Sequence, residues 1–328
     1  MAGFTELILK SNAYRLLSAD KTAGRLSHAY MLLTSDKQYL REYLKIFARL
    51  IMCENSATSS CNVCRICRLI SEEKLADAHF YPENKGDKLG AKEAGEIIEE
   101  TFVKPYELDK KIFIIEDIAD MNISGQNKLL KTVEEPSQNT FILIGASSIH
   151  AVLPTVQSRV KKLEIPAFST DELMKALIVE CPDVERLTVA CRASDGTYGD
   201  AKKLYFDEDF AKANGLAKWV LTNMQSSRDV LKVMTEVSSS GVKTSEFLDA
   251  LEVLFYDMMV YFSAKRVSET LPNAEFFKEL KGFNRASAVY ALDRIKETKV
   301  KDYFNGNDIM MMERLLLQIL EGKYKWKR

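Results

Sequence analysis

The sequence of 328 residues has no long apolar run, no excess of charge of either sign and few glycines. No stretch approaches the roughly 18 consecutive apolar residues of a membrane-spanning helix, so such a span is excluded. Lysine and arginine number 46 against 47 acidic residues, which gives a formal net charge of -1. A protein that binds duplex DNA by itself usually carries a marked positive excess. We therefore expect any nucleic-acid role to depend on partners.

The first residues also lack the features of a secretory signal peptide. The segment Met1 to Glu6 contains neither a basic region nor an apolar one. We therefore expect a cytoplasmic protein. In a reducing compartment, clustered cysteines are more often metal ligands than disulfides, and four of the six cysteines cluster between residues 53 and 67.

The first half of the chain alternates strand-like and helix-like patterns. Four short apolar runs have the character of buried strands: Ala29–Leu33, Ile112–Ile115, Phe141–Ile144 and Val160–Ile165. Between the first two, apolar residues recur every three or four positions from Leu40 to Ile51, as on one face of a helix. Apolar strands separated by amphipathic helices indicate a parallel sheet covered on both faces. We predict an α/β domain over residues 1–167.

The pattern changes after Pro166. Ser169 and Glu172 have the spacing of a capping box and predict a helix to about Val179. Beyond that point no strand pattern is found, and apolar residues recur at helical spacing through 210–222, 245–262, 285–295 and 308–320. We predict a small helical domain over 168–206 and an all-helical bundle over 207–328.

The clustered cysteines follow the pattern C-x7-C-x2-C-x2-C; they are Cys53, Cys61, Cys64 and Cys67. Zinc prefers four tetrahedral ligands of this kind, and four thiolates leave no open position, which favours a structural site over a catalytic one. An iron–sulfur cluster is the alternative, but the C-x3-C-P ending of a ferredoxin is absent. Four buried cysteines without metal are the other alternative. Cys181 and Cys191 stand apart and are interpreted as core residues.

A nucleotide-binding loop would be expected after the first strand, where the sequence runs from Thr34 to Arg41. Such a loop needs glycines whose amides surround the phosphates, followed by Lys and Ser or Thr. This segment has no glycine, and Asp36 would add negative charge beside the phosphates. We expect no ATP binding. Glu116 and Asp117 resemble a magnesium-binding acidic pair, but without a phosphate loop we interpret them as a solvated strand end.

Several motifs together resemble those of a known family. In chain order they are Arg25–Tyr30, the four cysteines, Lys128–Pro136 (KLLKTVEEP) and Ser158-Arg159-Val160. The chain resembles the clamp-loader subunits of bacterial DNA polymerase III, which are AAA+ proteins, most densely between residues 25 and 168. In the ATPase subunits of that family, the gamma/tau type, the phosphate loop has glycines at the positions of Thr34 and Tyr39, and Lys and Thr at those of Leu40 and Arg41.

A second nucleotide-binding element differs as well. The segment Gly196–Ala201 is similar to one in which the ATPase subunits carry an ATP-sensing arginine, and here Gly199 takes that position. Both differences favour the delta-prime type, which has no ATPase activity of its own. The resemblance then implies that Arg159, in the Ser158-Arg159 motif, acts in trans on the γ-phosphate of ATP in a neighbouring subunit, as an always-charged guanidinium is suited to do.

The resemblance also implies partners. They would be gamma/tau motor subunits and a delta subunit in a hetero-pentameric ring, with residues 207–328 in a collar, and the sliding clamp and primed DNA reached through the complex. No catalysis is expected from the isolated chain, although the assembly belongs to the DNA-directed DNA polymerase holoenzyme. Two alternatives remain: a degenerate gamma/tau-type ATPase, and a zinc-dependent nucleic-acid-binding protein. Against the second, only Arg65 and Arg68 are basic around Cys61–Cys67. Arg159 itself could be an ordinary surface arginine.

Overall fold

The computed structural model describes residues 2–56, 59–84, 86–87, 89–263, 273–303 and 308–326. The chain divides into two compact units: unit 1 comprises residues 1–179 with 197–199, and unit 2 comprises residues 180–196 with 200–328. The predicted boundaries at 167 and 206 stay a prediction. Across the described ranges, every helix is too short or too polar to cross a membrane.

Unit 1 contains a five-stranded parallel sheet in the order β2-β3-β4-β1-β5. The strands are β1 (Ala29–Leu33), β2 (Ala78–Tyr81), β3 (Lys111–Ile115), β4 (Thr140–Ala146) and β5 (Lys161–Glu164). Each of the four predicted apolar runs forms a strand. The sheet is parallel because every connection contains a helical crossover. β1 lies between β4 and β5, where Met31 pairs with Ile144 on one side and with Lys162 on the other.

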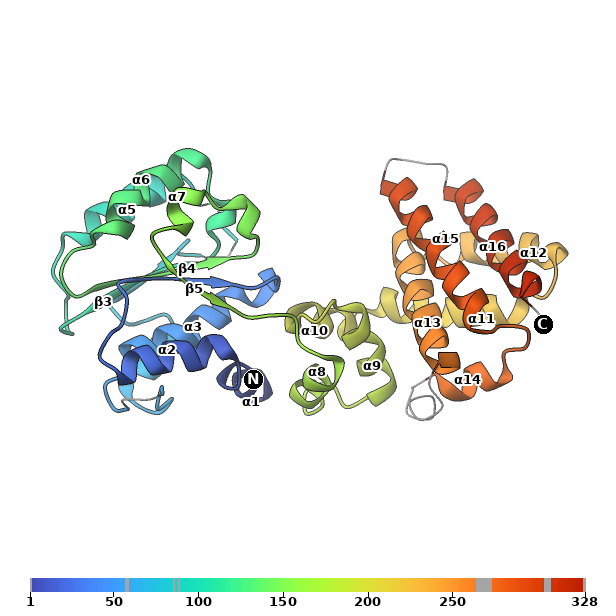
Figure 1. Cartoon of the computed structure of the whole chain (residues 1–328), viewed down its shortest axis with the longest axis horizontal. Coiled ribbons are helices and arrows are strands. Elements are labelled where there is room, and N and C mark those ends of the chain that lie inside the picture. The colour runs from blue at the N-terminus through green and yellow to red at the C-terminus, as the bar shows by residue number, and fades with distance from the viewer. Residues whose placement is uncertain are drawn as a thin grey trace. The chain divides into compact units, whose positions relative to one another are not determined.

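Helices cover both faces of this sheet, as predicted (Figure 1). One face is covered by α2 (Asn12–Thr22) and α3 (Leu40–Met52), and the other by α5 (Ala91–Thr101), α6 (Ile123–Glu134) and α7 (Pro154–Gln157). The remaining helices of the unit are α1 (Ala2–Leu9), α4 (Arg65–Ser71) and α8 (Thr170–Leu177), with short 3-10 helices η1 (Lys37–Tyr39), η2 (Ile118–Asp120) and η3 (Ile149–Ala151).

Local sequence explains these elements. Leu40, Tyr43, Leu44 and Phe47 are fully buried, so the apolar face of α3 packs on the sheet. The predicted capping box opens α8: the backbone N–H of Ser169 donates to the Glu172 carboxylate at 2.9 Å, and the Ser169 hydroxyl accepts from the Glu172 N–H at 3.3 Å.

In the described residues of unit 2, every secondary-structure element is a helix, as predicted. Its helices are α9 (Val184–Ala193), α10 (Tyr198–Phe206, whose first two residues belong to unit 1), α11 (Glu208–Asn223), α12 (Ser227–Ser239), α13 (Thr244–Ser263), α14 (Ala274–Glu279), α15 (Arg285–Tyr303) and α16 (Asp308–Lys325). Among the described residues, buried side chains of α11 to α16 form an apolar cluster that includes Phe247, Phe255 and Leu315. Cys181 and Cys191 are buried, as expected of core residues. The predicted fold class, an AAA+-like parallel-sheet domain followed by helical parts, is confirmed.

Candidate functional site

The four clustered cysteines lie together in unit 1, at the junction of α3 and α4. Their sulfur atoms all lie within 4.8 Å of one another. Cys53 caps the C-terminus of α3, Cys64 caps the N-terminus of α4, and Cys67 lies in the first turn of that helix. Cys53 and Cys67 are buried, whereas Cys61 and Cys64 are partly exposed. The cluster can hold a metal ion.

Backbone amides surround the sulfurs of this cluster. The N–H groups of Cys61, Cys64 and Cys67 donate to the sulfurs of Cys53, Cys61 and Cys64 at 3.3–3.4 Å. Amides of Val63 and Cys64 that donate to the Cys61 sulfur lower the pKa of that thiol to about 6. With Zn–S bonds of about 2.3 Å, tetrahedral geometry requires sulfurs roughly 3.8 Å apart. The sulfurs of Cys61 and Cys67 are 4.0 Å apart, so the donor set fits a tetrahedral dication.

The loop after β1 is filled by its own side chains. Asp36 is 2% exposed, and its carboxylate accepts hydrogen bonds from the backbone N–H of Tyr39 at 3.3 Å and from the Tyr43 hydroxyl at 3.2 Å. Leu40, which matches the lysine position of the ATPase subunits, is fully buried. In a phosphate-binding loop, backbone amides donate to the phosphates of a bound nucleotide. In this loop the acceptor is a carboxylate of the chain itself, that of Asp36.

Arg41 lies at the centre of a buried ion cluster. Its guanidinium forms two parallel hydrogen bonds with Glu73, at 2.9 and 2.5 Å, and a third with Glu116 at 2.8 Å. Two further N–H groups donate to the carbonyls of Pro82 and Glu83, at 2.9 and 3.1 Å. All five donors of the guanidinium are used. Hydrogen bonding to Arg41 lowers the pKa of Glu73 from its ordinary value of 4.5 to about 2.

In the acidic pair after β3, Asp117 is buried and Glu116 is partly buried, so the interpretation of the pair as a solvated strand end is wrong. Glu116 pairs with Arg41, and Asp117 is 3% exposed. The Asp117 carboxylate accepts from the Ser147 N–H at 3.1 Å and from the Ser147 hydroxyl at 2.5 Å. It thereby joins the carboxyl ends of β3 and β4, while Lys37 lies 3.9 Å away and balances its charge. The error has a physical cause: the cations that stabilise this pair come from α3 and η1, far away in sequence.

Ser158 and Arg159 follow α7 and precede β5. The Arg159 guanidinium donates to Glu134, at the end of α6, at 2.8 Å and to the Thr155 carbonyl at 2.9 Å. The Ser158 hydroxyl donates to the same carbonyl at 3.1 Å. The Arg159 side chain is 32% exposed and that of Glu134 53%, so the pair lies at the surface. Two of the matching motifs, KLLKTVEEP and Ser158-Arg159-Val160, thus meet through one ion pair.

Sequence reasoning missed Glu73 and Glu134 as partners of these arginines. The sequence does indicate that Arg41 needs an acidic partner. Arg41 falls on the apolar face of the predicted α3, and a buried arginine requires acidic partners. No local pattern marks Glu73, which follows α4 with a positive φ of 57°. Glu134 belongs to a quoted motif, but its contact with Arg159 spans 25 positions.

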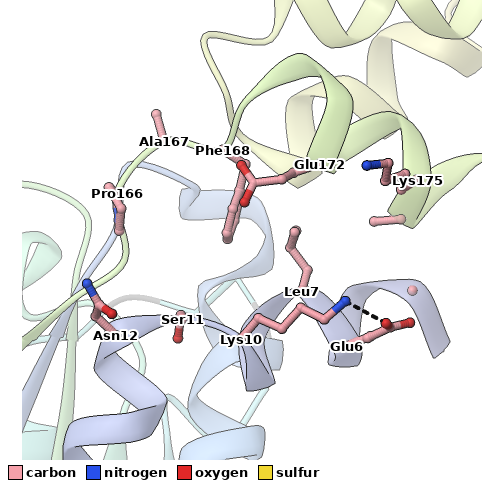
Figure 2. Close-up of a pocket in the computed structure, with 12 residues that line it drawn as sticks. Glu6, Leu7, Lys10, Ser11, Asn12, Pro166, Ala167, Phe168, Glu172 and Lys175 are labelled. Carbon is pink, nitrogen blue, oxygen red and sulfur yellow. Dashed lines mark hydrogen bonds and ion pairs between the residues drawn. The ribbon is translucent and has the colours of Figure 1, made fainter.

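Unit 1 also has a cavity of about 320 Å³ between α1 and α8. Figure 2 shows Leu7 and Phe168 in its wall, with Glu6 and Lys10 paired at its rim at 2.7 Å. The predicted site residues lie elsewhere in the described chain.

Sequence comparisons with known proteins find subunits of DNA polymerase III. A family model described as "DNA polymerase III, delta subunit" matches residues 9–169. The chain is 22% identical over 317 residues to DNA polymerase III subunit tau of Bacillus subtilis, covering 88% of this chain and 56% of that protein. It is 19% identical over 346 residues to subunit gamma of Buchnera aphidicola from Schizaphis graminum, covering 97% and 95%. The chain spans only 28% of the gamma/tau subunit of Mycobacterium tuberculosis, to which it is 26% identical.

Among solved structures, a gamma subunit-related protein of Thermotoga maritima aligns with a TM-score of 0.41 and 17% identity, covering 94% of this chain and 99% of that one. The Bacillus subtilis clamp loader delta protein aligns with a TM-score of 0.37 and 10% identity over the same shares. The sequence matches support a subunit related to the clamp loader of DNA polymerase III: the family model covers just under half of this chain, and the named relatives are gamma and tau subunits.

Proposed function

We propose that this chain is a non-ATPase subunit of the delta-prime type, which supports ATP-dependent loading of a sliding clamp onto primed DNA within a complex. The observation that carries the proposal is the occupation of the loop after β1. Leu40 and Arg41 stand at the lysine and threonine positions of the ATPase subunits, and both side chains are buried. An ATPase needs an ammonium and a magnesium-bound hydroxyl at these positions.

Arg41 has a further consequence for nucleotide chemistry. Its guanidinium pairs with Glu116, the first residue of the acidic pair after β3. A carboxylate bonded to a buried guanidinium is already charge-balanced, so a magnesium ion would have to displace Arg41 to bind there. Since Arg41 is 4% exposed and fully hydrogen-bonded, that displacement would be costly. Both features argue against the gamma/tau alternative, even though the named relatives are gamma and tau subunits.

We further propose that Arg159 acts in trans on ATP bound by a neighbouring subunit. In favour, the guanidinium is held in place by Glu134 and by the Thr155 carbonyl while remaining about one-third exposed. A pre-positioned, accessible guanidinium is what stabilisation of a transferred phosphoryl group requires. The partners proposed for this role are gamma/tau-type motor subunits and a delta subunit.

The metal proposed for the four cysteines is zinc, in a structural role. Zinc would be held by the sulfurs of Cys53, Cys61, Cys64 and Cys67, which lie within 4.8 Å of one another. Closed sites with four thiolates stabilise folding and leave no position for a reacting water.

The experiment that tests the proposal uses the complex reconstituted with its motor subunits. The Arg159→Ala variant should assemble normally yet lower DNA-stimulated ATPase activity and clamp loading. An arginine finger raises the rate of hydrolysis at one ATP site by about 10³–10⁵-fold. The variant complex should therefore lose the part of its ATPase activity that comes from the ATP site next to Arg159. Arg159→Lys should rescue little, because an ammonium lacks the bidentate fork.

Lys162→Ala is the matched control, since Lys162 is an exposed cation nearby that bonds Gln157 at 2.9 Å. If Arg159→Ala loads clamps as fast as this control, Arg159 is a surface residue. Saturable, magnesium-dependent ATP binding by the pure chain at micromolar concentration would instead favour a gamma/tau-type ATPase.

A further inference from the structure

We propose that the Asp36 carboxylate and the Gly199 amide form a ligand-independent latch, which holds the first turn of α10 against the loop after β1. Both residues belong to unit 1, which includes residues 197–199 although the residues on either side belong to unit 2. The inference concerns the conformation of this chain alone and does not rest on its membership of a ring.

The latch is a buried, charge-assisted hydrogen bond. The backbone N–H of Gly199 donates to Oδ2 of Asp36 at 2.8 Å. The same carboxylate accepts from the Tyr39 amide and the Tyr43 hydroxyl, so three donors converge on one anion. Unpaired amides at the first turn of a helix favour negative charge, and Asp36 supplies that charge from within the chain.

Aromatic rings surround this hydrogen bond and exclude water. Tyr198 is fully buried, with its ring 4.8 Å from that of Phe4 and 5.0 Å from that of Tyr39. Burial, with Asp36 alongside, raises the pKa of Tyr43, as expected in a site of low polarity. Hydrogen bonds to charged groups are stronger in such surroundings than in water.

The latch also requires glycine at position 199. A Cβ atom there would lie 2.4 Å from Oδ1 of Asp36, 2.9 Å from the Tyr39 ring and 3.1 Å from Cβ of Gln38. Carbon atoms do not approach a carboxylate oxygen that closely, so any side chain at 199 must displace Asp36. Asp36 and Gly199 are therefore sterically coupled.

This coupling connects two departures from the ATPase pattern that look independent in the sequence. One is the loop without glycines, which contains Asp36; the other is Gly199 at the position of an ATP-sensing arginine. An arginine at 199 could not fit while Asp36 occupies its present place. In this chain the carboxylate lies where a Cβ atom at 199 would have to fit, and the contact needs no nucleotide.

Hydrogen exchange of the full chain, read from peptides spanning residues 195–206, tests the latch. Asp36→Ala should accelerate exchange of the first-turn amides of α10 at least tenfold, because a buried bond to a charged acceptor is lost. The β4 amides should be unaffected. Asp36→Asn keeps the size of the side chain and one acceptor oxygen, so it should accelerate exchange less than Asp36→Ala. This variant also provides the test if the alanine variant does not fold. Asp120→Ala is the matched control, since Asp120 is half-exposed and bonds Lys37 near the same loop.

A double-mutant comparison separates the latch from general destabilisation. Gly199→Ala should accelerate exchange more in the wild-type background than in Asp36→Ala, because the clash with the carboxylate is gone in the latter. Exchange in Asp36→Ala that matches Asp120→Ala, or equal effects of Gly199→Ala in both backgrounds, would overturn the latch. Protection of wild-type α10 by added Mg²⁺–ATP would contradict the proposed non-ATPase function while leaving the effect of Asp36→Ala intact, so the two failures are distinguishable.

Discussion

Replacing Arg41 by methionine should destabilise unit 1 selectively. The change removes the guanidinium but keeps an unbranched chain that still fits beside Phe80, over whose ring the guanidinium lies at 5.3 Å. It leaves the Glu116 carboxylate without its cation and Glu73 with Lys45 alone, at 2.8 Å. Breaking a buried pair by removing one partner costs about 3–5 kcal/mol. Because Lys45 still balances Glu73, we expect about 3 kcal/mol.

The two units can be followed separately in one urea titration. Both tryptophans, Trp219 and Trp326, belong to unit 2, so their fluorescence monitors that unit. Hydrogen exchange of α3 and β3 amides monitors unit 1. The Arg41→Met variant should lower the free energy of unfolding measured by exchange and leave the fluorescence transition unchanged. Arg41→Lys should give an intermediate loss, since an ammonium keeps the charge without the fork.

The control is Arg15→Met, which removes an exposed arginine from α2 in the same unit. A loss below about 1 kcal/mol for Arg41→Met, or one equal to that of Arg15→Met, would refute the reasoning that this cluster stabilises the sheet edge.

Three further predictions concern the same unit. Protein purified without chelator should contain about one zinc per chain by elemental analysis, and chelation should destabilise α4; iron, or a folded protein without metal, would contradict the site. The Glu73 pKa of about 2 lies below its ordinary 4.5, so its contribution is full above pH 4.5 and is lost as the pH falls toward 2. The stability difference between wild type and Glu73→Gln should shrink over that window in acid titrations; a constant difference would contradict the shift. Gly145→Ala should cost about 3 kcal/mol in urea unfolding, because its Cβ would lie 2.0 Å from the Glu116 carbonyl oxygen; a neutral effect would show that β4 can move.

Local patterns predicted the parts of this fold that are determined locally. The runs around β1, β3 and β4 are continuously apolar because both faces of those strands are buried, and such runs can be recognised in a single sequence. β2 was missed because Ala78-His79-Phe80-Tyr81 is only four residues long and includes a histidine. The helices α12 and α14 were also missed. α14 has only six residues, which is too short for a clear helical pattern, and the other four helices of the bundle were enough to predict it.

The candidate sites divide in the same way. The four cysteines were predicted together because their spacing is nearly local, and their sulfurs do lie within one cluster. The partners of Arg41 could not be predicted, because Glu73 is 32 positions away and Glu116 is 75. Only the sheet topology brings those carboxylates to the same edge. The lack of glycine in the loop after β1 was readable from the sequence, but the side chains that fill the loop were not.

The position of β1 between β4 and β5 has a consequence for folding on the ribosome. β1 is the first strand to be synthesised, yet its two neighbours, β4 and β5, follow roughly 110 and 130 residues later. At about 5–20 residues per second, β1 waits on the order of ten seconds for its first partner strand. Meanwhile β2 and β3 can pair with each other, so the edge of the sheet can form before its centre. The chain should therefore expose the apolar β1 segment during synthesis, and folding of unit 1 should be limited by closure of this long-range contact.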